Sequence, residues 1–211
     1  IPDDPASLRD SIVTAMARGR DGRVWVGERG GRIDKLDPVT GKSEHVLSGL
    51  SGDVLGMTQD AHERLWITVR GGLYRYTRGR PPERVDPHNQ WLKHPLEVEL
   101  GPDGRMYART FGEGLFRIDQ ETLAVSRVSM EQPNQRVLWG SQLTLHDGIF
   151  WYASDGGMLR LDMQHDRFEA VSGVLNDRAV NAFDFTADGL WMLRPDGLEH
   201  YRYRGDGLVL D

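Results

Sequence analysis

The chain has 211 residues, 38% hydrophobic and 27% charged, so it can bury a sizeable core and is not expected to be disordered. Its formal net charge of −6 argues against a nucleic-acid-binding protein, which would carry a basic surplus or stripe. The absence of cysteine excludes disulfides, thiolate metal sites and a cysteine nucleophile, and no apolar run is long enough to predict a membrane span.

An aromatic residue recurs along the whole chain at a nearly constant spacing. The five are Trp25, Trp66, Tyr107, Trp151 and Trp191, at intervals of 41, 41, 44 and 40 residues. The position five residues after the aromatic is glycine in four copies and aspartate in the fifth. A fixed period of this length indicates a repeat architecture. It divides the single domain 1–211 into five repeats at about 10–50, 51–94, 95–136, 137–178 and 179–211.

The first repeat predicts four short strands joined by turns. Alternation of apolar and polar residues places them at Ser11–Ala17, Arg23–Gly27, Arg32–Leu36 and Ser43–Leu47. Asp21-Gly22 predicts a tight type I′ hairpin between the first two strands, because both central positions of that turn need positive φ. Four antiparallel strands in about 41 residues are typical of one β-propeller blade. We therefore expect an all-β propeller with about twenty strands, almost no helix, and the five aromatics packed between blades.

The repeat resembles the two-component regulator propeller repeat. The best match is LWITVRGGLYRYT at Leu65–Thr77, followed by Val24–Asp37, and shorter matches stand at Gly112–Asp119, Gly156–Asp162 and Asp196–Tyr203. The resemblance implies an extracytoplasmic sensor of a membrane-bound histidine kinase, hybrid regulator or diguanylate cyclase. It also implies propellers that usually have seven blades, so five repeats predict a partial, open segment of a larger propeller. A closed five-bladed ring, and end blades that pair with another copy, are the alternatives.

The predicted strand directions place two sets of loops on one face. With alternating strands a to d, the b–c turns lie beside the d–a connections, which include His88 and His94. Arginine forks match carboxylates and phosphates, and tryptophans outside the repeat register are candidates for stacking on a ligand. Arg109 lies just before one of these turns. The predicted ligand-binding residues are Arg29, Arg70, Trp91, Arg136, Trp139 and Arg194.

Catalytic and metal motifs are not evident in the sequence. It holds no nucleophile elbow, zinc-protease motif or phosphate-binding loop. His88 and His94 form the only close histidine pair, at a spacing that no short metal motif uses. The Asp-Gly pairs lack the ligand pattern of a calcium-binding loop. We interpret them as hairpin turns. We expect no catalytic residue, no metal and no cofactor.

Three functions remain open at this stage. The first is a non-catalytic, periplasmic sensor segment of a two-component or cyclic-di-GMP receptor, which binds an anionic or carbohydrate-like small molecule or a protein. We expect it to bind no nucleic acid and to contact a membrane only through parts outside these residues. Its end blades could bind other copies of the chain. The second is a lyase resembling the virginiamycin B lyase family, although that family's catalytic histidine and glutamate find no matching positions here. The third is a protein-interaction scaffold.

Overall fold

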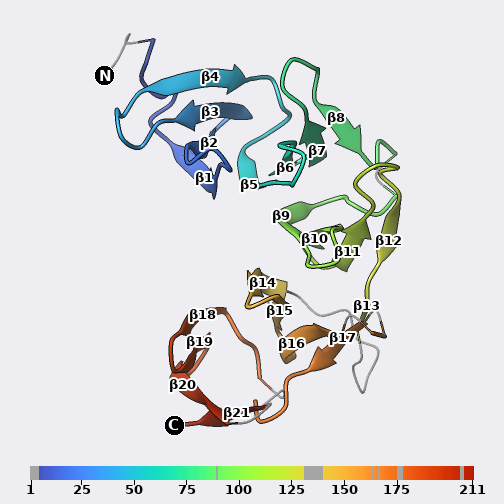
Figure 1. Ribbon diagram of the computed structural model, residues 1–211. Coiled ribbons are helices and arrows are strands. Elements are labelled where there is room, and N and C mark those ends of the chain that lie inside the picture. Colours follow the sequence, from blue (N-terminus) through green and yellow to red (C-terminus); the bar gives the residue numbers. More distant parts are fainter. Residues whose placement is uncertain are drawn as a thin grey trace.

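The computed structural model describes residues 5–88, 90–130, 140–162, 164–165, 167–174, 178–204 and 207–211. These residues form strands, turns and bends, and none of them lies in a helix that could cross a membrane. The strands build five separate antiparallel sheets, one for each predicted repeat, so the chain is an open five-bladed β-propeller (Figure 1). The predicted all-β fold is confirmed.

The strands follow one another in sequence within each blade. Blade 1 consists of β1 (Val13–Arg18), β2 (Val24–Glu28), β3 (Arg32–Leu36) and β4 (Ser43–Leu47). Blade 2 consists of β5 (Val54–Gln59), β6 (Leu65–Val69), β7 (Gly72–Tyr76) and β8 (Glu83–Val85). Blade 3 consists of β9 (Pro95–Leu100), β10 (Met106–Thr110), β11 (Gly114–Ile118) and β12 (Val125–Arg127).

The fourth blade carries one additional strand. Blade 4 consists of β14 (Gly140–His146), β15 (Ile149–Ser154), β16 (Gly157–Asp162) and β17 (Arg167–Ala170). The short β13 (Ser129–Met130), which leaves blade 3, pairs parallel to the outer edge of β17 and so links the two blades. Blade 5 consists of β18 (Ala182–Thr186), β19 (Gly189–Arg194), β20 (Gly197–Arg204) and β21 (Gly207–Leu210).

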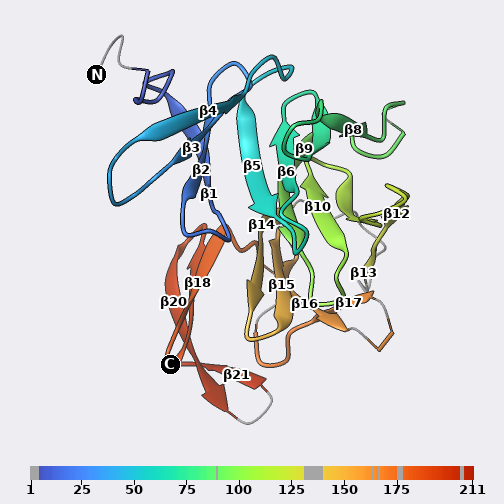
Figure 2. The same ribbon diagram turned by 45° about the horizontal axis from the view of Figure 1, so that its top comes forward.

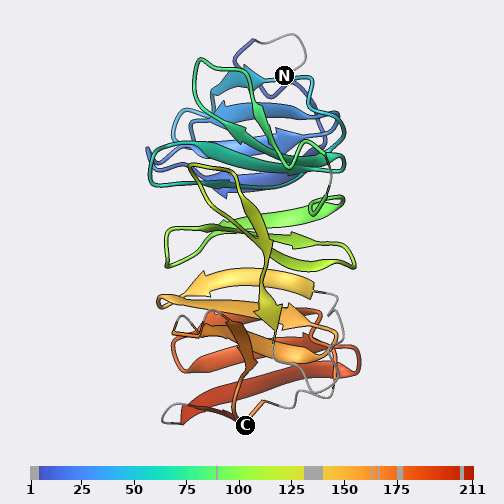
Figure 3. The same ribbon diagram turned by 90° about the vertical axis from the view of Figure 1, so that its right-hand side faces the viewer.

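The five blades lie along an arc that does not close. Figure 3 shows the sheets stacked in chain order, and Figure 1 shows a gap between blade 1 and blade 5. The C-terminus lies on the side of this gap (Figure 2). The first strand of each blade lies toward the centre of the arc (Figure 1), and residues of β1, β5 and β9 line a cavity there, which we call the central channel. The expected open segment is therefore what the structure contains.

The connection between the first two strands of a blade differs from the prediction. In blade 1 it spans residues 19–23, where the Gly19 N–H donates to the Arg23 carbonyl at 2.7 Å and only Gly22 has positive φ, at 82°. The predicted two-residue type I′ turn at Asp21-Gly22 is therefore wrong. That turn occurs in blade 4, where Asp147 and Gly148 have φ of 49° and 73°. A type I′ hairpin needs a two-residue loop, and β14 and β15 are separated by two residues only, whereas the loop of blade 1 is longer.

Apolar side chains fill the space between consecutive blades. Trp25 of blade 1 packs with Val54 and Ile67 of blade 2, and Trp66 packs in the same way with Val98 and Met106 of blade 3. Tyr107 packs into blade 4, and Trp151 packs into blade 5. These four aromatics are at most 5% exposed. Their predicted role between blades is confirmed, and the core is a row of four interblade layers.

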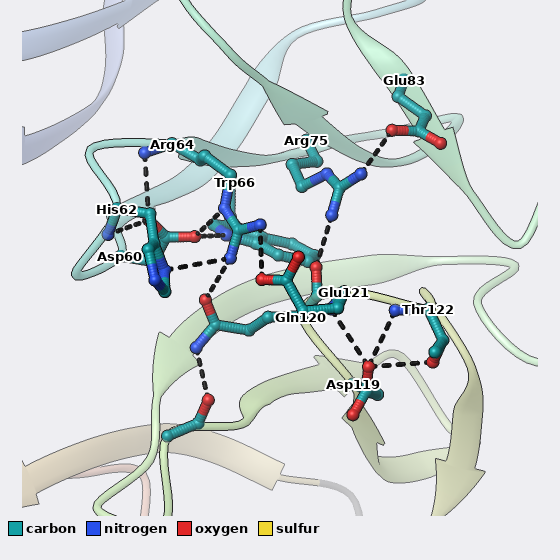
Figure 4. A network of polar contacts seen from close by, with 11 residues as sticks. Asp60, His62, Arg64, Trp66, Arg75, Glu83, Asp119, Gln120, Glu121 and Thr122 are labelled. Atoms are coloured by element: carbon teal, nitrogen blue, oxygen red, sulfur yellow. Dashed lines mark hydrogen bonds and ion pairs between the residues drawn. The ribbon is translucent and has the colours of Figure 1, made fainter.

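A polar network joins blades 2 and 3 (Figure 4), between the loop that follows β5 and the turn that follows β11. The buried Asp60 carboxylate accepts from Trp66 Nε1 at 2.9 Å and from Arg64 Nε at 2.6 Å. The same Arg64 guanidinium donates to Gln120 and Glu121 of blade 3, each at 2.8 Å. This network fixes the indole of Trp66 and holds the two blades in register.

Candidate functional site

The loop arrangement predicted from strand direction is confirmed by the strand pairing. In blade 2, Val69 lies opposite Val54 and Gly72, while Val85 lies opposite Leu73. The b–c turn therefore lies at the same end of the sheet as the start of the first strand and the end of the fourth. We refer to this end of the propeller as the b–c face.

A cavity of about 460 Å³ opens at the b–c face between blades 2 and 3. Four of its lining residues are apolar and two are basic: Leu55, Pro95, Leu96, Phe111, Arg70 and His94. Leu55 and Leu96 come from the inner strands β5 and β9, so the cavity lies at the mouth of the central channel. We call it the mouth cavity.

Local backbone structure places the polar residues of the mouth cavity at its rim. Arg70 follows the last residue of β6 in the b–c turn, and His94 precedes the first residue of β9. The Phe111 N–H donates to the His94 carbonyl at 2.9 Å, which ties the two sides of the rim together. Phe111 is 55% exposed and forms part of the cavity lining. A charged side chain beside an exposed aromatic suits an amphipathic small molecule.

Arg70 is a cation without a partner among the described residues. It is exposed, and its guanidinium forms neither a hydrogen bond nor an ion pair with them. An arginine fork can bind a carboxylate or a phosphate through two parallel hydrogen bonds. The mouth cavity can therefore hold the anionic end of a molecule whose body contacts Leu55, Leu96 and Phe111.

A second cavity, of about 290 Å³, continues from the first along the channel. It shares Leu55 and Leu96 with the mouth cavity and is lined by β1, β5, β9 and the side chain of Arg109. Arg109 donates to the Glu97 carboxylate at 3.0 Å, and this carboxylate also accepts the Leu143 N–H of blade 4 at 3.1 Å. Arg109 is thus held in an ion pair in the deeper part of the channel.

Two carboxylates of β9 have perturbed acidity in this deeper cavity. Burial raises the pKa of Glu97 even though Arg109 opposes the shift. Burial raises the pKa of Glu99 further, to about 7, with repulsion from Glu97 as the second cause. The deeper cavity therefore changes its charge near neutral pH, because Glu99 titrates there.

The structure does not bring the predicted arginines together. Arg29 lies on blade 1 and forms an ion pair with Asp10 at 3.5 Å. Arg194 is only 2% exposed, and its guanidinium donates to the Glu199 carboxylate and, at 3.1 Å, to the Arg178 carbonyl. The buried position of Arg194 makes it a structural residue of blade 5. Of the three, only Arg70 lines the mouth cavity.

The predicted tryptophans have different outcomes. Trp91 lies in the connection between β8 and β9. Its backbone N–H donates to the Asp86 carboxylate at 2.7 Å, and the centroid of its ring lies 6.1 Å from that of Phe116. This half-buried ring belongs to the packing between blades 2 and 3. Trp139 and Arg136 lie outside the described residues.

Sequence reasoning did not select the residues that complete the site. Phe111 follows β10 without a motif of its own, and the sequence offers His94 only as part of a connection and of a histidine pair without metal-site spacing. Glu97 and Glu99 carried a usable signal, because carboxylates at alternate positions of an inner strand share one side of that strand. A first strand faces the channel in every blade, so this alternation indicates a charged channel wall.

A third cavity lies between blades 1 and 2 on the opposite face and is a weaker candidate. It has a volume of about 290 Å³ and is more polar, but four of its charged side chains are already paired with each other. Asp21 contacts Lys35 at 2.8 Å, and Glu44 contacts Arg78 at 2.9 Å. Over the residues that the structure describes, no group of three or more histidine, aspartate or glutamate side chains could hold a metal ion.

The comparisons with known proteins support the repeat class and the fold. No curated protein matches this chain in sequence. The extracellular domain of a one-component system from B. thetaiotaomicron matches with a TM-score of 0.72 and 13% identity. The match covers 100% of this chain and 30% of the length of that domain. The extracellular domain of a hybrid two-component system of that organism matches with a TM-score of 0.70 and 21% identity, over 99% of this chain and 28% of its own.

A lyase structure is similar to the same degree. Virginiamycin B lyase from Staphylococcus aureus matches with a TM-score of 0.73 and 16% identity, over 99% of this chain and 72% of its own. Identities this low show the shared propeller fold and no more. The two component regulator propeller family matches residues 7–30, and this match confirms the resemblance recognised in the repeats.

Proposed function

We propose that this propeller is the sensor part of a bacterial two-component or cyclic-di-GMP signalling receptor, and that it is not itself an enzyme. In this proposal it lies in the periplasm, on a protein anchored in the membrane by parts outside these residues. The repeat match at residues 7–30 supports it, as does the likeness to extracellular domains of one- and two-component systems.

The observation that carries the proposal is the guanidinium of Arg70 at the rim of the mouth cavity, which has no hydrogen-bond or ion-pair partner among the described residues. Among the described residues, the cavity presents an apolar wall and the guanidinium of Arg70 without a partner, which suits a small molecule with an apolar body and a carboxylate or phosphate. A ligand that binds one arrangement of the receptor more tightly than another shifts the population toward it. Ligand capture between blades 2 and 3 would thus change the signalling state of the receptor.

A binding screen tests this proposal directly. Aliphatic and aromatic carboxylates and phosphate monoesters are added to the chain, and the melting temperature and the binding isotherm are measured. We expect at least one class to bind and stabilise the chain, and Arg70→Ala to lose that binding. Arg29→Ala is the matched control, because it removes the same charge from the same face outside the cavity. Equal loss in both variants, or no binding by any class, would contradict the proposed site.

Signalling needs its own test in the complete receptor. The full reading frame should encode a membrane-spanning helix and a kinase or diguanylate cyclase domain. In that receptor, Arg70→Ala should abolish the response to the ligand without lowering the amount of protein. An unchanged response would leave a ligand site without a sensory role and would contradict the proposal.

A lyase is the second candidate function, and the likeness to virginiamycin B lyase favours it. A solved structure of a catalytically inactive variant of that lyase contains quinupristin, and its fold matches 96% of this chain. Incubation of the chain with quinupristin, followed by chromatography and mass spectrometry, tests this candidate. We expect no conversion, and a new product formed in proportion to the amount of chain would replace the sensor proposal with the lyase.

A further inference from the structure

The mouth cavity and the deeper cavity each hold a charged side chain that has no oppositely charged partner among the described residues. At the mouth it is the guanidinium of Arg70, and in the deeper cavity it is the carboxylate of Glu99. Glu97, two residues before Glu99 on β9, is by contrast paired with Arg109 at 3.0 Å. The half-buried Glu99 therefore lacks a counter-charge from this part of the protein.

The two cavities adjoin, so one elongated molecule can occupy both. Leu55 of β5 and Leu96 of β9 line both cavities. Glu99 lies three residues beyond Leu96 on β9, and a strand rises by about 3.3 Å per residue, so Glu99 lies on the order of 10 Å deeper. A molecule that enters at the mouth crosses an apolar stretch before it reaches Glu99. That stretch is formed by side chains of β1 and β5, namely Ala15, Met16 and Met57.

The strands packed against β9 offer Glu99 no other cation. β5 and β6 contain no charged residue, and Arg109 of β10 is held by Glu97. The other titratable groups on these strands are engaged elsewhere. The hydroxyl of Tyr107 donates to a carboxylate of its own blade at 3.0 Å, and the ring of His146 on β14 stacks on an aromatic ring of blade 5 at 3.8 Å. Burial and repulsion by Glu97 accordingly raise the pKa of Glu99 to about 7.

We propose that the two cavities form one binding site for a zwitterion with an apolar body, in which Arg70 binds the carboxylate or phosphate and Glu99 binds an ammonium group at the other end. The inference rests on the ligand site proposed at Arg70 and adds the second charged group of the ligand. An ammonium group in the deeper cavity neutralises a carboxylate that the surrounding strands leave without a counter-charge. The fitting chemical class is an extended ω-amino acid with about 10 Å between its charges.

This arrangement makes recognition of the ammonium group dependent on pH. Glu99 attracts a cation only when it is ionised, so the gain in affinity appears as the pH rises through about 7. His94 lines the mouth cavity and could add a pH dependence of its own. A ligand that has the carboxylate but no ammonium group meets the same histidine. The ratio of the two affinities therefore isolates the contribution of Glu99.

Three straight-chain probes of equal length test this inference on the 211-residue chain. Octanoate has the carboxylate only, octylamine has the ammonium group only, and ω-aminooctanoate has both. Isothermal titration calorimetry measures their dissociation constants at pH 8 and at pH 6. At pH 8 we expect ω-aminooctanoate to bind at least about fivefold more tightly than octanoate, and this preference should largely disappear at pH 6. Octylamine should bind more weakly than ω-aminooctanoate, because it cannot pair with Arg70.

Two variants assign the preference to a residue. Glu99→Gln keeps a polar side chain of similar size but removes the ionisable group, so octanoate and ω-aminooctanoate should bind it equally well. Glu83→Gln, which removes a carboxylate from the outer strand of blade 2, is the matched control and should keep the preference. Arg70→Ala should weaken both ligands, since both use the carboxylate.

The outcomes separate this inference from the proposed function on which it rests. Equal affinity for octanoate and ω-aminooctanoate at both pH values, with loss of both in Arg70→Ala, would overturn the zwitterion site and leave the Arg70 site in place. A preference that Glu99→Gln retains would also overturn it, because the ammonium group would then bind elsewhere. Binding of none of the three probes would contradict the Arg70 site and this inference together.

Discussion

At the scale of single residues, the environment decides what the same side chain contributes. Trp66 is fully buried, and its Nε1 donates to the Asp60 carboxylate at 2.9 Å. Trp191 occupies the same position of its repeat and is 39% exposed. A buried aromatic contributes through the area removed from water and through the cavity that its loss would leave. An exposed one contributes little of either.

Removal of these tryptophans should therefore have unequal effects. Trp66→Ala or Trp25→Ala should destabilise the chain by about 3–5 kcal/mol, as for large core aromatics. Trp191→Ala should cost less than about 1 kcal/mol, as for an exposed residue. Urea denaturation followed by circular dichroism measures all three. Similar losses for Trp66 and Trp191 would show that the repeat position, rather than the neighbouring blade, determines the contribution.

Glu99 predicts a specific dependence of stability on pH. Burial and the charge of Glu97 raise its pKa in the folded chain to about 7, from 4.5. Between these two values the folded state binds more protons than the unfolded state, so stability falls as pH rises. The contribution is fully present below pH 4.5 and fully lost above about pH 7, and it amounts to about 3 kcal/mol at most.

The variant Glu99→Gln removes this titration. At pH 8 it should be more stable than the native chain by about 1–3 kcal/mol, and at pH 4 it should gain nothing. Denaturation at a series of pH values measures the difference. Glu83→Gln, on the outer strand of blade 2 and 55% exposed at its side chain, is the control and should show no such pH dependence. A gain that is independent of pH would contradict the role assigned to Glu99.

At the scale of structural elements, the loop between the first two strands anchors the aromatic of its blade. In blade 2 this loop begins with Asp60, which is fully buried and accepts the N–H groups of His62 at 2.8 Å and of Arg64 at 3.0 Å. Burial opposes ionisation of Asp60, but the hydrogen bonds from Trp66 and Arg64 outweigh it and lower its pKa. The ionised carboxylate therefore stabilises the folded chain at pH values above the ordinary pKa of aspartate. That stability is lost as the pH falls through the lowered pKa of Asp60.

The variant Asp60→Asn should destabilise the chain by about 3–5 kcal/mol, because it leaves the Arg64 guanidinium partly unpaired in a buried network. Asp21→Asn is the matched control in the corresponding loop of blade 1. The Asp21 side chain, which pairs with Lys35, is 46% exposed. Loss of this ion pair should therefore cost less than about 1 kcal/mol of folding free energy. Thermal denaturation distinguishes the two. Equal and small losses would show that the network in Figure 4 does not hold blades 2 and 3 together.

At the scale of the whole molecule, stability is expected to vary along the arc. Blades 2, 3 and 4 have a neighbour on both faces, whereas blade 5 has one only. Blade 1 also has one neighbouring blade, but the N-terminal segment covers part of its free face through Arg9 and the buried Asp34. In repeat proteins each interface adds to the stability of the units it joins.

Hydrogen exchange should follow this order. Amides of β19 in blade 5 should exchange roughly tenfold or more faster than those of β6 and β10, because local opening of an end blade breaks one interface instead of two. Mass spectrometry of peptides from each blade measures the difference under native conditions. Uniform protection across the five blades would indicate a single cooperative unit and would contradict a stability that is built up interface by interface.

The sequence by itself determined the repeat, the number of blades and the orientation of the loops. The β3 and β4 strands have the predicted bounds Arg32–Leu36 and Ser43–Leu47, because alternation and turn residues report local strand geometry directly. The tight turn at Asp21-Gly22 was predicted wrongly, because the dipeptide does not reveal how many residues separate the strands.

Only the tertiary structure decided which residues of the b–c face are available. Arg29, Arg70 and Arg194 occupy similar places in the sequence. Yet Arg29 is paired with Asp10, Arg70 lines a cavity without a partner among the described residues, and Arg194 is buried against Glu199. The exposure of Trp191 was likewise hidden, since its repeat is like the others. Both depend on which blade or segment lies beside a side chain, and that contact joins residues far apart in the chain.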